Sequence, residues 1–144
     1  MNQVFADTGY WIALLNPRDE LHERARATSV TAGKVRIVTS EWVLTELLNS
    51  FAERGDSLRA AAARTVSLLR ERADITVVPF SDAPFQRAFD LFQERRDKDW
   101  SITDCSSFLT MQRLGITAAL SYDRHFEQAG FKALLRTGDL PADF

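Results

Sequence analysis

The chain has a single cysteine, Cys105, which excludes an internal disulfide and a zinc site built from several thiolates. Long apolar runs are also missing, since no uninterrupted stretch approaches the roughly 18 residues that span a bilayer. The first residues lack the basic and apolar stretches of a signal peptide. No repeat, low-complexity segment or interdomain linker interrupts the sequence. These absences predict a soluble cytoplasmic protein in a reducing compartment, with no membrane segment.

An excess of positive charge is missing as well. The net charge is -2 and the isoelectric point is about 5.7, which excludes proteins that coat nucleic acid or bind membrane surfaces through overall basicity. Any polyanionic partner must therefore be held by a local group of cations. The chain does contain 45% hydrophobic and 26% charged residues among 144, the balance of one soluble globular domain. We expect that single domain to cover residues 1–144.

Short β-like runs alternate with helical stretches, which predicts an α/β fold with a central parallel sheet of four or five strands flanked by helices. We expect strands at 4–6, 36–39, 75–78, 118–121 and 133–135. We expect helices at 9–15, 21–32, 40–54, 58–72, 83–95, 102–114 and 124–129. Ser40 is a good N-cap for the third helix, and Gly115 suits a left-handed C-cap after the sixth.

Four acidic residues occupy related positions in this pattern. Asp7 and Asp123 follow the first and fourth strands, at the edge where open α/β sheets bind their ligands. Glu46 lies at the margin of the apolar face of the helix at 40–54, and Asp104 lies in the first turn of the helix at 102–114. If the strands are parallel, all four side chains can point into one cleft.

Each acid also has a structural explanation when it is taken alone. Asp7 and Asp123 could each cap the helix that follows, and residues 101–104 resemble a capping box that ends at Asp104. Glu46 could turn to solvent, but a carboxylate beside leucines loses solvation unless a positive group neutralises it. Capping does not predict that the acids share one edge of the sheet. We therefore favour a shared site.

A shared pocket of carboxylates suits a divalent metal ion, because a cation removes the repulsion between the acids. Oxygen ligands favour Mg²⁺ or Mn²⁺ over zinc, which prefers nitrogen and sulfur. Mg²⁺ keeps several waters, which leaves positions for phosphate oxygens and an attacking water. Two ions about 3.5 to 4 Å apart could activate that water and stabilise the leaving oxygen. The matching chemistry is phosphodiester hydrolysis.

Four blocks of sequence resemble the successive motifs of PIN-domain ribonucleases. They lie at 7–9, 40–49, 97–108 and 121–126, and their order and spacing cover nearly the whole chain. The third block is the most specific, and it is similar to that of the small VapC toxins of bacterial type II toxin-antitoxin pairs. The resemblance implies a PIN-like α/β/α sandwich, Mg²⁺- or Mn²⁺-dependent endonuclease activity on RNA, and frequent formation of homodimers.

The resemblance also assigns roles to particular residues. It implies that Asp7, Glu46, Asp104 and Asp123 are the metal-binding acids, and that the Thr8 hydroxyl orients a carboxylate or a water. Ser121 stands where threonine often precedes the fourth acid, so the hydroxyl is retained. Asp99 could bind metal at the rim, although a solvated loop carboxylate is the competing explanation.

A toxin of this kind needs an inhibitory partner. By resemblance, a separately encoded antitoxin would lay a segment across a groove between the early helices and insert a basic side chain into the acidic pocket. The helices at 40–54 and 58–72 offer apolar residues that could line this groove or belong to the core, namely Leu44, Leu48, Leu58 and Leu68.

Local cations could hold the RNA backbone near the acids. Basic side chains precede the helix of Asp104 and follow Asp123, and these are Arg95, Arg96, Lys98 and Arg124. The competing explanation for residues 95–98 is an ordinary solvated loop.

The aromatic rings of the chain offer fewer contacts with RNA. Trp11, Trp42 and Trp100 are most simply core or interface aromatics, although Trp100 lies in a charged loop and could stack on a base. His125 could contact substrate, whereas His22 is expected to pack or to pair with Asp19.

Three other functions fit parts of the pattern. A non-catalytic PIN-like module that binds RNA or protein would keep its acids only as caps, and the loss of one acid would favour it, but none is missing. A phosphoacceptor switch needs paired acids after the first strand, whereas Ala6 precedes Asp7, and it needs an aspartate where Pro79 follows the third. A haloacid-dehalogenase-type phosphatase needs an acid where Gly9 stands.

Overall fold

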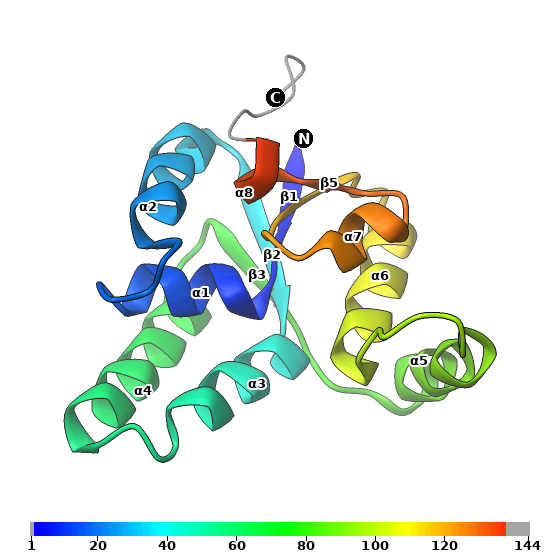
Figure 1. The fold of residues 1–144 in the computed structure, drawn as a ribbon, viewed down its shortest axis with the longest axis horizontal. Coiled ribbons are helices and arrows are strands. Elements are labelled where there is room, and N and C mark those ends of the chain that lie inside the picture. The colour runs from blue at the N-terminus through cyan, green and yellow to red at the C-terminus, as the bar shows by residue number, and fades with distance from the viewer. Residues whose placement is uncertain (1, 138–144) are drawn as a thin grey trace.

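A five-stranded parallel sheet forms the centre of the molecule, which a computed structural model describes for residues 2–137 (Figure 1). The strand order is β3-β2-β1-β4-β5. All four neighbouring pairs run parallel, as predicted. The strands are β1 (Gln3–Ala6), β2 (Arg36–Ser40), β3 (Ile75–Val78), β4 (Ala118–Leu120) and β5 (Lys132–Ala133).

The order of the strands places a crevice at a defined point. The chain builds outward from β1 through β2 to β3, and later returns to the other side of β1 with β4 and β5. Helices that leave adjacent strands in opposite directions open a gap at the carboxyl ends of those strands, where α/β sheets bind ligands. The gap here lies beyond β1 and β4.

Helices cover both sides of the sheet. Figure 1 shows α1 to α4 on one side and α5 to α7 on the other. Their bounds are α1 (Thr8–Leu15), α2 (His22–Thr31), α3 (Glu41–Phe51), α4 (Asp56–Glu71), α5 (Asp82–Glu94), α6 (Ile102–Leu114), α7 (Arg124–Gln128) and α8 (Leu134–Thr137), with a 3-10 turn η1 (Ala32–Lys34). This arrangement confirms the predicted α/β/α sandwich. The predicted domain of residues 1–144 extends beyond the described residues and stays a prediction.

Apolar strand residues form the core, where Val4, Phe5, Val38 and Leu120 are fully buried. Because helices cover both faces, the strands are apolar on both sides instead of alternating. Helix α6 is buried along most of its first ten residues, and much of that surface is Ser and Thr. This helix contacts both α5 and α3.

The caps that set the ends of two helices are those that the sequence predicts. The Ser40 hydroxyl accepts a hydrogen bond from the Val43 N–H at 3.2 Å. Ser101 and Asp104 form a complete capping box at the start of α6. Gly115 ends this helix with φ 70°, the left-handed conformation that glycine adopts without steric cost. These caps fix where α3 and α6 begin at the carboxyl edge of the sheet.

The predicted last strand is wrong in part. Residues 133–135 were expected to be extended, but β5 ends at Ala133, and Leu134 and Leu135 begin helix α8. Both leucines are buried. A short apolar run gives the same signal for a buried strand and for a buried helical turn. The other elements agree with prediction to within three residues at each end. None of the helices within residues 2–137 is both long and apolar enough to cross a membrane.

Candidate functional site

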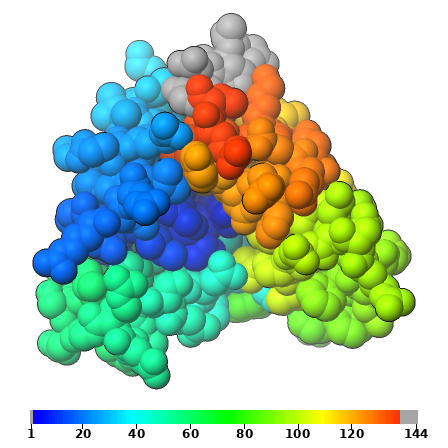
Figure 2. Space-filling model, in the orientation of Figure 1, coloured from blue at the N-terminus to red at the C-terminus, as the bar shows by residue number. Residues whose placement is uncertain are grey.

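An acidic pocket lies at the carboxyl edge of the sheet. Its volume is about 500 Å³. Figure 2 shows this face of the molecule, hollowed near its centre between the N-terminal half and the C-terminal elements. All of the predicted site residues line the pocket, together with the predicted rim acid, and these are Asp7, Thr8, Glu46, Asp99, Asp104 and Asp123. The structure therefore brings together side chains that α1, α3, α6 and α7 position separately. We call this cavity the acid pocket.

Asp7 follows β1 and stands at the N-cap position of α1, but its side chain forms no capping hydrogen bond. Instead, the Ser121 hydroxyl donates to Asp7 Oδ2 at 3.1 Å. Burial, which leaves 7% of Asp7 exposed, raises its pKa to about 7, and the nearby charges of Asp104 and Glu46 act in the same direction. The structural explanation from capping therefore does not account for this carboxylate.

Asp104 does serve as a cap, and it also lines the acid pocket. Its Oδ2 accepts a hydrogen bond from the Ser101 N–H at 3.0 Å, and the same atom lies 3.0 Å from His125 Nδ1. Burial raises the pKa of this carboxyl above its ordinary value, although the bonds from Ser101 and His125 oppose the shift. Capping and pocket formation are thus compatible at this position.

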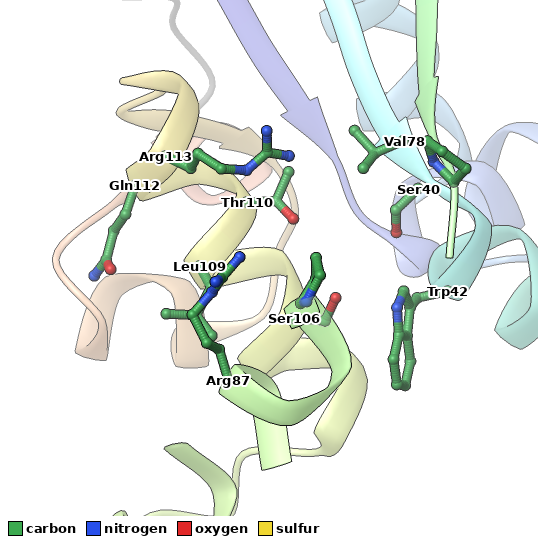
Figure 3. A pocket seen from close by; sticks show the side chains of 11 residues that line it. Ser40, Trp42, Val78, Arg87, Ser106, Leu109, Thr110, Gln112 and Arg113 are labelled. Carbon is green, nitrogen blue, oxygen red and sulfur yellow. The ribbon is translucent and has the colours of Figure 1, made fainter. Parts of the chain in front are cut away.

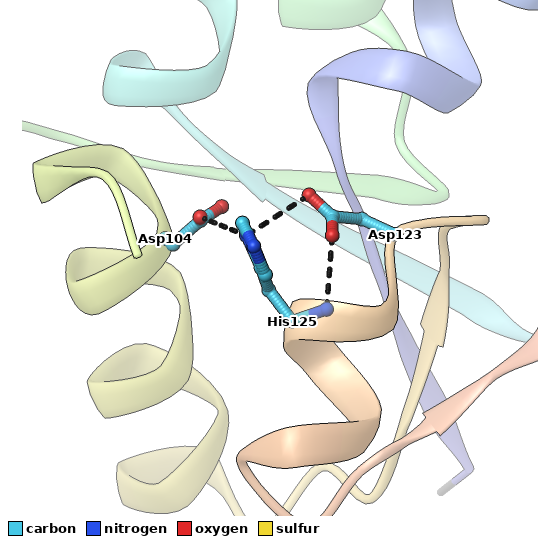
Figure 4. Close-up of side chains that lie close together, drawn as sticks. All are labelled: Asp104, Asp123 and His125. Atoms are coloured by element: carbon cyan, nitrogen blue, oxygen red, sulfur yellow. Dashed lines mark hydrogen bonds and ion pairs between the residues drawn. The ribbon is translucent and has the colours of Figure 1, made fainter. Parts of the chain in front are cut away.

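Asp123, Asp104 and His125 form a compact group (Figure 4). Asp123 caps α7 by accepting a hydrogen bond from the His125 N–H at 2.9 Å, and its other oxygen lies 3.4 Å from His125 Nδ1. One donor atom from each of the three side chains lies within 4.8 Å of the others. Neighbouring ligands on an octahedral ion with bonds of about 2.1 Å are about 3 Å apart. The spacing of this group therefore suits a metal ion.

Two further polar groups lack partners. The Glu46 carboxylate is half-buried on α3 and forms no hydrogen bond or ion pair with any residue in the described range 2–137. Thr8 is 4% exposed, and within the same range its Oγ1 has no hydrogen-bond partner. A buried hydroxyl without a protein partner is rare, and it is available to a water or an ion. Of the two predicted roles of Thr8, a bond to a carboxylate is not seen among the described residues, and the orientation of a water stays a prediction.

The charge of the acid pocket is one-sided. Four carboxylates and the rim residue Asp99 line it, whereas its lining contains no Lys or Arg among the described residues. Buried acids of the same charge repel, so one or more must be protonated unless a cation binds between them. Oxygen donors in this number fit a hard divalent cation.

The four cations that were predicted to contact RNA all lie outside the acid pocket. Arg95 is engaged with Asp97 through two hydrogen bonds of 3.0 and 3.1 Å, and its guanidinium lies 4.8 Å from the centre of the Trp100 ring. Neither Arg95 nor the other three predicted cations lines the acid pocket. A phosphate contact is therefore not supported for Arg95, and it stays a prediction for Arg96, Lys98 and Arg124.

Trp100 is a core residue, so the alternative of base stacking is wrong. It is 6% exposed, its indole N–H donates to Gln128 Oε1 at 3.0 Å, and its ring packs edge-on against Phe108. His22 is held by the Ala13 carbonyl, 2.6 Å from its Nδ1, and not by an Asp19 side chain.

Apolar side chains of two early helices line a hollow, and the groove predicted for an antitoxin stays a prediction. A hollow of about 400 Å³ opens between α1 and α4, lined by Trp11, Leu14, Leu15 and Leu68 among others. Of the four leucines for which a groove and the core were both open, Leu68 lines this hollow and Leu44 is part of the core. We call this hollow the α1–α4 groove.

Sequence reasoning undervalued three residues of the acid pocket. Ser121 joins two of the acids, because its hydroxyl donates to Asp7 and accepts from the Asp123 N–H at 3.0 Å. His125 contacts Asp104 and Asp123, and Tyr122 presents an exposed ring at the pocket. Their position beside Asp123 in the block 121–126 is the sequence feature that indicates a place in the site. The contact between His125 and Asp104 is visible only in the fold.

Comparisons with known proteins agree with one another. The family model described as the PIN domain matches residues 4–132. The 23S rRNA-specific endonuclease VapC20 of Mycobacterium tuberculosis is 30% identical over 134 residues, which cover 89% of this chain and 95% of the relative. The crystal structure of VapC20, described as a sarcin-ricin loop cleaving toxin, has a TM-score of 0.80 at 26% identity over 89% of this chain and 95% of its own.

A more distant structure has the same fold. FitAcB from Neisseria gonorrhoeae has a TM-score of 0.61 at 14% identity, and the match covers 90% of this chain and 95% of that one.

Proposed function

This chain belongs to the PIN-domain family, and from its acid pocket we propose that it is a metal-dependent endoribonuclease that hydrolyses RNA phosphodiester bonds. One observation carries the proposal. Asp7, Glu46, Asp104 and Asp123 come from separate elements, yet they line one pocket beside a buried Thr8 hydroxyl that lacks a partner within the described residues. Structural capping does not explain that convergence.

The four acids would hold Mg²⁺ or Mn²⁺, which supplies an activated water and neutralises the charge that develops on the phosphate. The rest of the chemistry falls to the side chains of this chain. Ser121 fixes the orientation of Asp7, and the Ser101 N–H fixes that of Asp104. The Thr8 hydroxyl is free to orient a water, since no protein group within residues 2–137 occupies it.

The identity of the relatives supports a finer proposal about biological role. VapC20 is named a 23S rRNA-specific endonuclease and is described as a toxin. We therefore propose that this chain is the toxin of a toxin-antitoxin pair, acts on RNA in the cytoplasm, and is restrained by a cognate antitoxin. Ribosomal RNA is the first substrate to test. The α1–α4 groove is the apolar surface that fits a helical segment of the antitoxin.

The test is cleavage of purified ribosomal and total cellular RNA with Mg²⁺, with Mn²⁺ or with EDTA, followed by mapping of the cut ends. The wild-type protein should cut only with metal. Asp7→Asn and Asp104→Asn should stay folded and lose about a thousandfold or more of the rate, because each removes charge that holds metal and phosphate together. Asp90→Asn, an exposed acid on α5, is the matched control and should cut normally.

Two outcomes would contradict this proposal. Equal cleavage by the wild-type protein and both pocket variants would show that the acid pocket is not the catalytic site. Binding of RNA or protein without cleavage in any metal would favour the alternative of a non-catalytic PIN-like module, in which the caps formed by Asp104 and Asp123 are the whole role of those acids.

A further inference from the structure

A second cavity of about 500 Å³ lies between α3, the end of β3, α5 and α6 (Figure 3). Its lining differs from that of the acid pocket. It contains two arginines, Arg87 on α5 and Arg113 on α6, and no acidic residue from the described part of the chain. In a protein with a net charge of -2, this cavity has a local formal charge of +2 from Arg87 and Arg113. We call it the arginine cavity.

Neither arginine is used by the protein itself. Arg87 and Arg113 are exposed and form no ion pair or hydrogen bond with any residue between 2 and 137. Some arginines of the described residues are paired with acids, as Arg70 is with Glu41 and Arg136 is with Glu127, and others, such as Arg64, are not. Two guanidinium groups that line one cavity without an acid create a locally positive potential that attracts an anion.

Buried hydroxyls on α6 face the same space. Ser106 and Thr110 are 6% and 8% exposed, and within the described residues neither side chain forms a hydrogen bond. Figure 3 shows both hydroxyls directed across the cavity toward Ser40 and Trp42. Several hydroxyls in other helices bond back to the carbonyl four residues earlier, as those of Thr45 and Thr65 do. The hydroxyls of the arginine cavity therefore have hydrogen bonds left to make.

The arginine cavity is linked to the acid pocket. A smaller hollow of about 230 Å³ includes Trp42, Glu46 and Thr103 in its lining. It shares Trp42 with the arginine cavity and Glu46 with the acid pocket. The three hollows thus follow one another along α3 and α6. Asp104 and Arg113 are nine residues apart on α6, about 13 Å at a rise of 1.5 Å per residue.

We propose that the arginine cavity binds the sugar-phosphate backbone of the RNA strand a few nucleotides from the bond that is cut. This inference rests on the proposed function and supplies what the acid pocket lacks. A polyanion that approaches four acids needs cations nearby, and the acid pocket has none in its described lining. Arg87 and Arg113 can each bind phosphate through two N–H groups, and Ser106 and Thr110 donate further hydrogen bonds.

The test compares Arg87→Ala/Arg113→Ala with Arg64→Ala, which removes an exposed arginine on α4 that lines none of the three hollows. The probe is a fluorescent single-stranded RNA that the wild-type protein cuts. Its Kd is measured over a range of salt concentrations, with Asp104→Asn present in every protein to prevent cleavage. The double variant should raise Kd about tenfold or more, and should reduce the slope of log Kd against log salt by about 1.4, since each phosphate contact on a single strand contributes about 0.7.

The outcomes separate this inference from the proposed function. With Asp104 restored, the double variant should keep the wild-type kcat and Mn²⁺ binding and show the loss in KM, while Arg64→Ala matches the wild type throughout. If the wild-type protein cuts RNA but the double variant has an unchanged Kd and slope, the proposed RNA binding by the arginine cavity is wrong. The proposed nuclease function is then unaffected. A loss of binding that accompanies a change in the mass of the protein in solution would assign the arginines to contacts between copies and overturn it too. Absence of cleavage by the wild type would end both proposals.

Discussion

Asp7 is the residue whose charge is least compatible with its surroundings. Burial raises its pKa from 3.8 to about 7, so the folded, metal-free protein keeps a proton that the unfolded chain releases above pH 4. Its contribution to the free energy of unfolding is therefore fully present below pH 4 and is lost as the pH rises toward 7. A metal ion in the acid pocket would reverse this loss of stability at high pH, because it stabilises the ionised carboxylate.

Asp7→Asn should therefore stabilise the metal-free protein at high pH. In EDTA at pH 8, thermal unfolding should show a higher Tm for the variant, with a gain of up to about 4 kcal/mol for a shift of about 3 pKa units. The difference should shrink toward pH 4. Mn²⁺ should raise the Tm of the wild type at pH 8 and leave that of Asp7→Asn nearly unchanged. A wild-type Tm in EDTA that does not fall between pH 5 and pH 8 would contradict this account.

The acids of the pocket could be predicted from sequence, but the contacts between them could not. Asp7 and Asp123 follow strands, and that position alone directs them to one edge of a parallel sheet. Which atoms a hydroxyl or an imidazole contacts depends on packing between elements that are far apart in the chain. Ser121 reaches Asp7 across 114 positions, and His125 reaches Asp104 across 21. Local patterns contain no information about such distances.

At the scale of elements, helix boundaries follow from caps and breakers that are local in sequence. Ser40, Ser101 and Gly115 each act where they were predicted to act. The failure at α8 has a tertiary cause, because Leu134 and Leu135 are buried between neighbouring elements and not by pairing along a full strand. The sequence likewise left open whether the leucines of α3 and α4 line a groove or the core, since which face of α4 meets α1 is decided by packing.

The α1–α4 groove leads to a prediction about the antitoxin. Leu68 is 61% exposed at its rim, so Leu68→Glu should fold normally yet place a charge where an apolar helix would pack. Expression of the wild-type protein alone should arrest growth, and coexpression of the cognate antitoxin should restore it. Leu68→Glu should still arrest growth but escape rescue. Full rescue of this variant would show that the antitoxin binds elsewhere, and harmless expression of the wild type would remove the toxin role.

At the scale of the whole molecule, one exposed surface is unusually aromatic. Phe85, Phe89 and Phe92 on α5 are each between 42% and 49% exposed, and Phe85 stacks between Trp42 and Phe89 with ring centres 5.8 and 6.3 Å apart. Contiguous exposed aromatic surface indicates a binding interface. The expected homodimer would bury this stripe.

Phe85→Ser/Phe89→Ser should therefore shift the protein from dimer to monomer in light scattering coupled to size exclusion, because the stripe supplies the apolar area of the interface. Val30→Ser removes an apolar side chain that is 83% exposed on α2, and this control should leave the mass unchanged. A wild-type protein that is monomeric at high micromolar concentration would refute the dimer, and a double variant that remains dimeric would move the interface to another face.

The strand order has a consequence for how the protein is made. Asp7 directly follows β1, whereas the block with Ser121, Asp123 and His125 follows β4, which inserts beside β1 only after the intervening elements have been made. A nascent chain that ends before β4 therefore has no complete acid pocket, because Ser121, Asp123 and His125 are missing from its lining. If the pocket cuts RNA, protein fragments that end before β4 should not cut it, because they lack this part of the acid pocket.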